Sequence, residues 1–520
     1  MSTARRTCSG ALCRLAFMLC VSRCAGEVLV VDQNGGGDFS TIQAAVDGAA
    51  DGDTILVMPG VYLEWIKFNL SFREDGAESL PPKDLQLLSV AGPETTVIRG
   101  GIEFLGGESS DTVVRGFTLD GDVGSVKVSR GLTAVGGSRP VIENCIIRNY
   151  KDAGVICNSA MTLVDCLIVR NGKTETGGER HGGGIVALGC EVTLIRCTLV
   201  DNAGPNGGAL HAAGSYVTMT NCLVAENRPV FLGDGGSLFF EASVATLRFC
   251  TITQNHARNL CLHWLYDGRL GGIAALSYRG GPYYASRVRF EDCIIWDNEE
   301  VSLWVNGACR IELLNCCIND REVVQDEAAE VVVQNCINAD PLFVDPQAGD
   351  FRLRPDSPLI DRGGEGELPD TDLAGNSRVC WKGPDIGAFE YCAEQPPEPV
   401  LQFLRGDVNG DGNLNVGDAI NLLQFAFAGE RRPECLDAAD ANDDGRVNLA
   451  DTLTILAYLF AESGPSVEVL GRCTIDFTSD TLDCKRHQES CGYLKEWRPM
   501  PLPEPRRWLW QRPCPRDFRW

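Results

Sequence analysis

The feature that most constrains the fold of this chain is a short phrase that recurs through its middle. Each copy has a cysteine, a run of mainly β-branched or aliphatic residues and then an asparagine. A repeat of 20 to 50 residues indicates a solenoid, and short strands separated by Gly-rich turns favour a parallel β-helix over a helical repeat. The clear copies are 144–149, 165–171, 196–202, 221–227, 249–255 and 292–298, with weaker ones at 315–319 and 335–339.

The cysteine stands at the same place in every copy of the phrase. Equal phase predicts one inward stack, in which a buried cysteine acts as a small apolar residue. We favour this interpretation over disulfides between neighbouring turns, which the spacing also allows. The asparagine that ends each phrase, first Asn149, is expected to line a turn, where stacked amides bond to one another and to the backbone. The stacked cysteines are Cys145, Cys166, Cys197, Cys222, Cys250, Cys293, Cys316 and Cys336.

Both ends of the repeat region resemble known families. Residues 35–48 predict a capped amphipathic helix and Asp51–Tyr62 the first strands, a stretch that resembles the N-terminal cap of pectin-lyase-fold proteins. The segment from Asp340-Pro-Leu-Phe-Val to Asp385-Ile-Gly-Ala-Phe-Glu390 resembles the closing segment of bacterial β-helix proteins called choice-of-anchor Q. The resemblance spans residues 27–392 and implies an extracellular, right-handed parallel β-helix.

A twelve-residue pattern then occurs twice, 33 residues apart. Oxygen side chains stand at loop positions 1, 3, 5, 9 and 12, with glycine at position 6, which is the spacing that wraps oxygen ligands around a calcium ion. Each loop leads into an apolar segment with helical spacing, marked by Ile420, Leu423 and Phe427 and by Leu453, Leu456 and Phe460. With position 7 included, the predicted metal ligands are Asp407, Asn409, Asp411, Asn413, Asn415, Asp418, Asp440, Asn442, Asp444, Arg446, Asn448 and Asp451.

This pair of loop-then-helix units resembles the type I dockerin. The resemblance implies two calcium ions and docking to a partner, a cohesin-like or other cell-surface protein. It departs from the usual pattern at loop positions 10 and 11, where a Ser-Thr-like pair is replaced by Val416-Gly417 and Leu449-Ala450. A calcium-stapled stability domain that binds no partner therefore stays open as the alternative.

Charge and the N-terminus indicate where the chain acts. The formal net charge is −25 and the pI about 4.7, which argues against nucleic acid as a partner and suits a secreted acidic protein. Basic Arg5, Arg6 and Arg14 precede an apolar run and small residues near Cys24, which predicts a signal peptide. No stretch of 18 apolar residues follows, so no transmembrane segment is expected.

The predicted organisation has five parts. They are a signal peptide (1–26), the β-helix (27–392), a Pro-rich linker (393–402), the dockerin-like domain (403–465) and a basic, Trp- and Pro-rich tail (466–520) that we expect to be poorly ordered. Near the tail, either Cys473 with Cys484 or Cys435 with a neighbour could form a disulfide.

Signs of catalysis are weak. The motifs of polygalacturonases and pectin methylesterases are missing from the sequence, since its single Asp-Asp lies in a calcium loop and Arg310-Ile311 is followed by Glu312. Carboxylates and a histidine near Gly-rich turns are the remaining candidates, because loops on a rigid scaffold often carry function. These candidates are Asp120, Asp122, Glu179, Arg180 and His181.

Two functions follow for a mainly β chain of this kind, with a right-handed parallel β-helix and a small α calcium-binding, EF-hand-like domain. The first is a secreted calcium-binding protein for surface attachment, polysaccharide binding or complex assembly through the dockerin-like module. The second is a polysaccharide lyase or glycoside hydrolase that acts on acidic polysaccharide and is tethered by that module. The fold alone does not choose between them.

Overall fold

The computed structural model describes residues 26–69, 81–124, 126–172, 183–230, 236–256, 273–276, 285–299, 302–319, 323–325, 327–364, 366–392, 403–428, 432–460, 470, 473–474, 482, 484 and 500–501. Nearly all of the predicted signal peptide, the linker up to residue 402 and most of the predicted tail lie outside these residues.

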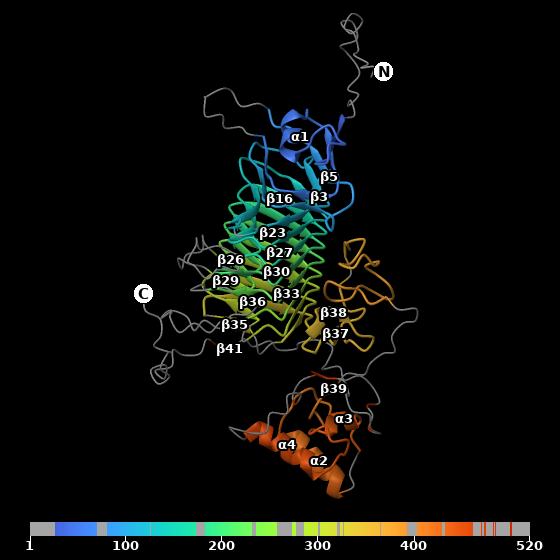
Figure 1. Cartoon of the computed structure of the whole chain (residues 1–520). Coiled ribbons are helices and arrows are strands. Elements are labelled where there is room, and N and C mark those ends of the chain that lie inside the picture. Colours follow the sequence, from blue (N-terminus) through green and yellow to red (C-terminus); the bar gives the residue numbers. More distant parts are fainter. Residues whose placement is uncertain are drawn as a thin grey trace, which may run out of the picture.

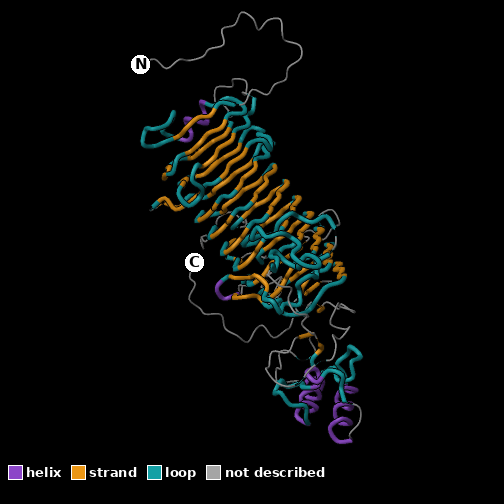
Figure 2. The backbone as a smooth tube through the Cα atoms, turned by 90° about the vertical axis from the view of Figure 1, so that its right-hand side faces the viewer, coloured by secondary structure: helices purple, strands orange, loops and turns teal. Residues whose placement is uncertain are grey.

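Three long parallel sheets form the repeat region, as predicted (Figures 1 and 2). Each turn of the chain adds one strand to each sheet in the same order, so we call them the first, second and third sheets. Neighbouring strands pair in parallel register, for example Val192 with Val217 in the first sheet and Leu199 with Val224 in the second. This repeated strand order is the parallel β-helix that the sequence predicts.

The strands have these bounds. The first sheet holds β1 (Val28–Val31), β2 (Thr54–Val57), β5 (Gln86–Ser89), β8 (Val113–Arg115), β13 (Val141–Glu143), β16 (Ala160–Val164), β19 (Glu191–Ile195), β23 (Tyr216–Thr220), β27 (Val244–Arg248), β30 (Arg287–Glu291), β33 (Arg310–Leu314) and β36 (Glu330–Gln334). The second holds β3 (Gly60–Tyr62), β6 (Thr96–Ile98), β9 (Thr118–Asp120), β14 (Ile146–Arg148), β17 (Leu167–Val169), β20 (Thr198–Val200), β24 (Leu223–Ala225), β28 (Thr251–Thr253), β31 (Ile294–Trp296) and β34 (Cys317–Ile318). The third holds β4 (Trp65–Phe68), β7 (Gly101–Phe104), β12 (Arg130–Ala134), β15 (Ala153–Cys157), β18 (Ile185–Leu188), β22 (Leu210–Ala213), β26 (Leu238–Glu241), β29 (Ile273–Leu276), β32 (Leu303–Val305), β35 (Val323–Gln325) and β41 (Met500–Pro501).

A short helix covers the start of the β-helix, but it occupies only the second half of the predicted stretch 35–48. Helix α1 (Ile42–Gly48) is capped by Thr41, whose hydroxyl accepts a hydrogen bond from the Ala44 amide. It buries Ile42, Ala45 and Val46, which join the core that runs between the three sheets. The apolar end of the solenoid is thereby shielded from solvent.

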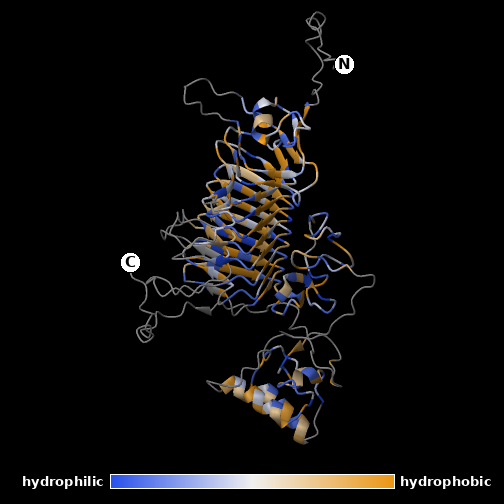
Figure 3. Ribbon diagram, viewed as in Figure 1, coloured by the Kyte–Doolittle hydropathy of each residue, from blue (hydrophilic) through white to orange (hydrophobic). Residues whose placement is uncertain are grey.

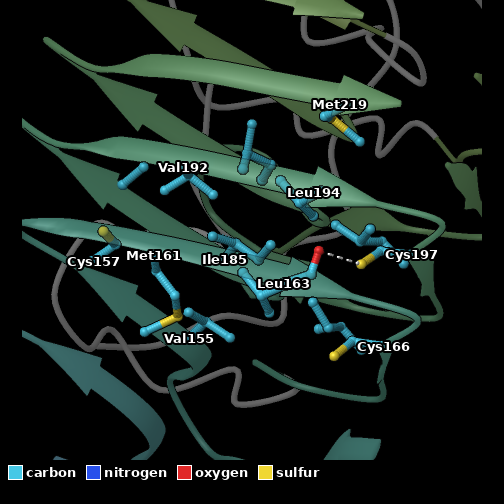
Figure 4. Close-up of a cluster of buried hydrophobic side chains, with 14 of the residues drawn as sticks. Val155, Cys157, Met161, Leu163, Cys166, Ile185, Val192, Leu194, Cys197 and Met219 are labelled. Atoms are coloured by element: carbon cyan, nitrogen blue, oxygen red, sulfur yellow. Dashed lines mark hydrogen bonds between the residues drawn. The ribbon is translucent and has the colours of Figure 1, made fainter. Parts of the chain in front are cut away.

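The predicted cysteine stack lies in the turn between the first and second sheets. All eight thiols are buried and free, and each lies against apolar core residues. Figure 4 shows the Cys197 thiol bonded at 3.4 Å to the carbonyl oxygen of Leu163, one turn earlier in the solenoid. The residue before each cysteine has a φ of 47° to 55°, which makes the tight corner. The apolar interpretation is confirmed, and these cysteines form no disulfides.

The predicted asparagine row lies in the turn between the second and third sheets. Each side-chain amide donates to the next side-chain oxygen at 2.8–3.1 Å, which links the buried Asn171, Asn202, Asn227, Asn255 and Asn298. The prediction is wrong for Asn149, because it stands four rather than five residues after its cysteine. It takes the corner conformation (φ 64°), and Tyr150 occupies its place in the row.

A closing segment, residues 337–392, packs on the outer face of the second sheet; we call it the strap. Its antiparallel pair β37 (Phe343–Asp345) and β38 (Asp350–Leu353), joined through the 3-10 turn Pro346–Ala348, lies beside the solenoid in Figure 1. The strap buries Leu223, Ala225 and Ile294 against its own apolar side chains. A disulfide between Cys380 and Cys392 closes its last loop.

The strap is held by a buried arginine. The guanidinium of Arg378 donates to the carbonyl oxygens of Asp385 (2.7 Å) and Gly387 (2.8 Å) and lies 4.2 Å from the ring centroid of Phe249. Its Nε is 3.6 Å from Glu390, which is also buried. Arg378 thus connects the strap to a corner of the β-helix.

The last region contains helices α2 (Val416–Leu423), which continues as a π-helical turn (Gln424–Ala428), α3 (Leu436–Ala439) and α4 (Leu449–Phe460). Helices α2 and α4 share a small core that includes Val408, Leu422 and Ile455. Strand β39 (Phe403–Leu404) pairs with β40 (Cys473–Thr474), and Cys435 is bonded to Cys484. Cys435 therefore has the partner that the sequence left open, and the alternative pair Cys473–Cys484 is wrong.

Two small pairings complete the described elements. The hairpin β10 (Asp122–Val123) and β11 (Val126–Lys127) projects from one turn, and β21 (Ala203–Gly204) pairs in parallel with β25 (Arg228–Pro229). Among the helices of the described residues, none is long and apolar enough to cross a membrane.

Candidate calcium sites

The first loop holds two buried carboxylates at its ends. Asp407 accepts hydrogen bonds from the amides of Asp411 (3.1 Å) and Gly412 (2.9 Å). Asp418 accepts from the amides of Asn409 (3.2 Å) and Asn415 (2.8 Å). Both carboxylates are at most 1% exposed. The backbone of the loop therefore orients its position 1 and position 12 side chains before any ion is considered.

The second loop repeats these bonds position by position. Asp440 accepts from Asp444 (3.1 Å) and Gly445 (2.7 Å), and Asp451 accepts from Asn442 (3.3 Å) and Asn448 (2.7 Å). Asp440 and Asp451 are again at most 1% exposed. Two sequences that differ at several positions thus fold into the same arrangement of buried carboxylates.

The charges agree with a divalent cation. Burial, followed by the nearby charges of Asp418 and Asp411, raises the pKa of Asp407 to about 6. Burial also raises the pKa of Asp418, and burial and the charge of Asp440 raise the pKa of Asp451 to about 6. Buried like charges cost free energy, which a bound cation offsets. Because the donors are oxygens, the set fits a hard ion such as Ca²⁺ rather than a soft metal.

The other predicted ligands divide into three groups by loop position. Asn409, Asp411, Asn442 and Asp444, at positions 3 and 5, offer side-chain oxygens. At position 7, Asn413 and Arg446 can offer a carbonyl oxygen, since an arginine side chain has no acceptor. The position 9 oxygens of Asn415 and Asn448 accept from the amides of Gly417 (2.7 Å) and Ala450 (2.8 Å) at the helix starts. These two side chains act as helix caps in the structure.

The helices that follow the loops expose a duplicated row of apolar side chains. The predicted helical spacing is confirmed, but much of the marked row faces solvent, because Ala419, Leu422 and Ile455 fill the core instead. Figure 3 shows hydrophobic residues along both α2 and α4. Each exposed residue has an exposed equivalent 33 residues later, with exposed fractions of 40% and 45% for Val416 and Leu449, 50% and 59% for Ile420 and Leu453, and 71% and 69% for Phe427 and Phe460.

The sequence did not indicate the role of one buried residue in this module. Arg405, two residues before the first loop, is 1% exposed, and its guanidinium contacts the second loop. The only signal in the sequence is a lone basic residue beside an acidic loop, which most often indicates a solvated charge. Its burial depends on the packing of the two repeats against each other.

The candidate catalytic residues are not gathered into a site within the described part of the chain. Asp120 accepts from Arg148 (3.0 Å), Asn149 (2.9 Å) and the Asp122 amide (3.1 Å). Burial acts to raise the pKa of Asp120, but these bonds outweigh it and hold the pKa below its usual value. Asp120 is therefore fixed as an anion, whereas Asp122 is exposed on a hairpin. Glu179, Arg180 and His181 lie outside the described residues.

Two family models match the chain. The model for a right handed beta helix region matches residues 100–280, and the model for a dockerin type I domain matches residues 405–460. No curated protein matches the sequence.

Several solved structures match the chain at low identity. Pectate lyase Pel9A is 14% identical over 70% of this chain and 96% of its own, with a TM-score of 0.37. The A-module of mannuronan C-5 epimerase AlgE4 from Azotobacter vinelandii is 16% identical over 56% and 90%, with a TM-score of 0.30. The pectin methylesterase from Aspergillus niger is 14% identical over 61% and 86%, with a TM-score of 0.28.

Type I dockerin domains typically bind calcium and dock to cohesins, which agrees with the loops and the exposed helix faces described above. The chain is thus a parallel β-helix, matched over residues 100–280 by the model for a right handed beta helix region, followed by a module that the dockerin type I model matches over residues 405–460.

Proposed function

We propose that this chain is a secreted β-helix protein that is attached to a cohesin-like protein through its calcium-loaded dockerin module. A dockerin joined to a β-helix fits a tethered carbohydrate-active protein. The observation that carries the proposal is the duplicated exposed row on α2 and α4, since matched apolar patches on a small soluble module indicate a binding surface. A calcium-stapled domain without a partner would have no need of this surface.

The chemistry of the row also describes the partner. At loop position 10 the chain has Val416 and Leu449, where the usual dockerin has a hydroxyl side chain. The partner should therefore present an apolar surface at these two points. Phe427, in the π-helical turn after α2, and Phe460, at the end of α4, extend the apolar contact, and large aromatic side chains commonly dominate such interfaces.

The test is binding of the full chain to a panel of purified type I cohesins, measured by calorimetry with calcium and with EDTA. We expect calcium-dependent binding by at least one cohesin, weakened about 10-fold to 100-fold by the double change Phe427→Ser and Phe460→Ser. The matched control is Tyr216→Ser, which removes an aromatic side chain of 66% exposure from the β-helix and should leave docking unchanged. Calcium binding without any cohesin binding would support the stability domain instead.

The outer face of the first sheet favours a second role, contact with polysaccharide. Tyr216 projects there between the exposed Glu191 and Val244 of the neighbouring strands, and Thr218 lies beside it. An exposed ring beside hydroxyl and charged groups suits the apolar face and the hydroxyls of a sugar. Binding to a glycan array should weaken in Tyr216→Ser. Release of unsaturated or reducing ends from acidic polysaccharide would favour the lyase or hydrolase alternative.

A further inference from the structure

A buried arginine joins the start of the first calcium loop to the second loop. The Nη1 of Arg405 donates to the carbonyl oxygens of Asp440 (2.6 Å) and Asp437 (3.2 Å), and its Nη2 is 3.0 Å from a carboxylate oxygen of Asp443. Asp440 and Asp443 are positions 1 and 4 of the second loop, and Asp437 lies in the helix before it. A side chain of the first repeat therefore holds the backbone of the second.

Neighbouring contacts stiffen this connection. The amide of Gly406, between Arg405 and the first ligand Asp407, donates to the carbonyl oxygen of Ala438 at 2.7 Å. The ring of Phe403 lies 5.1 Å from the Arg405 guanidinium and packs with Cys435, Ala438 and Cys484. The chain leading into the first loop is thus bonded and packed against the chain leading into the second.

The two loops differ at the residue that this arginine contacts. Position 4 of both loops is left-handed, with φ of 73° at Gly410 and 58° at Asp443. An aspartate adopts this conformation less readily than a glycine. Position 4 is not among the ligand positions of such a loop, so the carboxylate of Asp443 is better explained by the ion pair with Arg405. The equivalent of Arg405 in the second repeat is Ala438, so the bridge runs in one direction only.

We propose that Arg405 and Asp443 couple the two loops, so that calcium in one loop raises the affinity of the other. An ion in the first loop fixes Asp407, and with it the two preceding residues, Gly406 and Arg405. This lowers the conformational entropy that the second loop loses on binding. Such coupling is reciprocal. It goes beyond the docking role and holds whether or not α2 and α4 bind a partner.

The first test is calorimetric calcium titration of the full chain. Asp444→Ala disables the second loop and Asp411→Ala the first, each at position 5 and neither of them one of the two bridging residues. We expect the remaining loop to bind about tenfold more weakly than in the intact chain. When Asp443→Gly is also present, the affinity of the remaining loop should fall only about twofold or less. An undiminished loss in that background, or independent sites in the intact chain, would overturn the proposal.

Asp443→Gly is the informative variant because Gly410 already occupies this position in the first loop, so the backbone accepts it. Arg405→Gln should act alike, but it leaves a buried cavity and can unfold the module. Arg432→Gln removes an equal charge from an exposed position of the same module and should leave the coupling intact.

A second readout follows the coupling without relying on affinity. In the Asp444→Ala chain, only the first loop can load. Calcium should then slow hydrogen exchange at the amides of Gly445 and Asn448, which bond to Asp440 and Asp451. Adding Asp443→Gly should remove this protection while the first loop still binds. Equal protection with and without Asp443 would refute the bridge.

Discussion

The asparagine row of the β-helix and the aspartates at positions 1 and 12 of the two loops are both buried polar side chains at repeated positions, and their polar groups are satisfied in different ways. Each asparagine is donor and acceptor at once, so Asn202 bonds to Asn227 and Asn227 to Asn255 without outside help. Each of these carboxylates can only accept hydrogen bonds, and the carboxylates beside it in the same loop have the same charge. A stack of amides therefore stabilises itself, whereas a pair of carboxylates needs a cation.

The largest difference between the two regions should appear in their hydrogen exchange when calcium is removed. We expect EDTA to expose the amides of 403–428 and 432–460 to hydrogen exchange while those of the Asn227 turn stay protected. An ion at 100 times its Kd contributes about 2.7 kcal/mol per site, since it binds the folded form only. Asp407→Ala and Asp440→Ala should each abolish one calorimetric site. Unchanged hydrogen exchange in the dockerin module after EDTA would contradict the claim that its buried carboxylates need a cation.

The asparagine row should show the reverse behaviour. Asn227→Ala removes the acceptor of the Asn202 amide and the donor to the carbonyl oxygens of Leu199 and Ala225. Orphaned buried groups cost about 1–3 kcal/mol each, so we expect roughly 3 kcal/mol of lost stability in urea unfolding. The loss should be equal with and without calcium. Asn149→Gly, outside the row, serves as the control and should cost less than Asn227→Ala, because glycine accepts the left-handed corner (φ 64°) and only one part-buried bond, to Asp120, is lost.

A smaller effect should appear in the strap, where a carboxylate has an arginine partner. Burial and the charge of Asp385 raise the pKa of Glu390 to about 8, against the opposing effect of Arg378. Because the folded state favours the protonated acid, the stabilisation is complete below the ordinary pKa and is lost as the pH rises towards 8. Hydrogen exchange of residues 359–391 should therefore be faster at pH 9 than at pH 5, after correction for the intrinsic rate.

Glu390→Gln should flatten this dependence, because the amide stays neutral at both pH values. The groups facing Glu390 are Arg378, Asp385 and Asp372. If the variant kept the full difference between pH 5 and pH 9, Asp385, with a pKa of about 6, would be the titrating group instead.

Spacing along the chain was enough to predict much of the fold. Cysteines in constant phase predicted the inward stack, and oxygens at fixed loop positions predicted the carboxylates that the two loops bury. The same reasoning could have corrected the error at Asn149. Its cysteine is four residues away instead of five, and a one-residue difference moves a side chain to another part of the turn.

Other features could not be read from spacing. The apolar residues of α2 and α4 surround both helices, so periodicity alone did not tell that Leu422 is buried while Ile420 is half exposed. The bonds of Asp120 to Arg148 and Asn149 join neighbouring turns of the solenoid and could not be read from the sequence either. The partner of Cys435 and the position of the strap likewise depend on contacts between distant segments.

The sequence by itself determined the repeats and the ligand chemistry, because periodic side chains and donor types are properties of the local chain. The tertiary structure alone decided how each polar group is balanced. Arg405 is a lone cation in the sequence and a bridge between two loops in the fold. Whether a charge is solvated, paired or left to a metal ion depends on which distant residues surround it, and only packing brings those residues together.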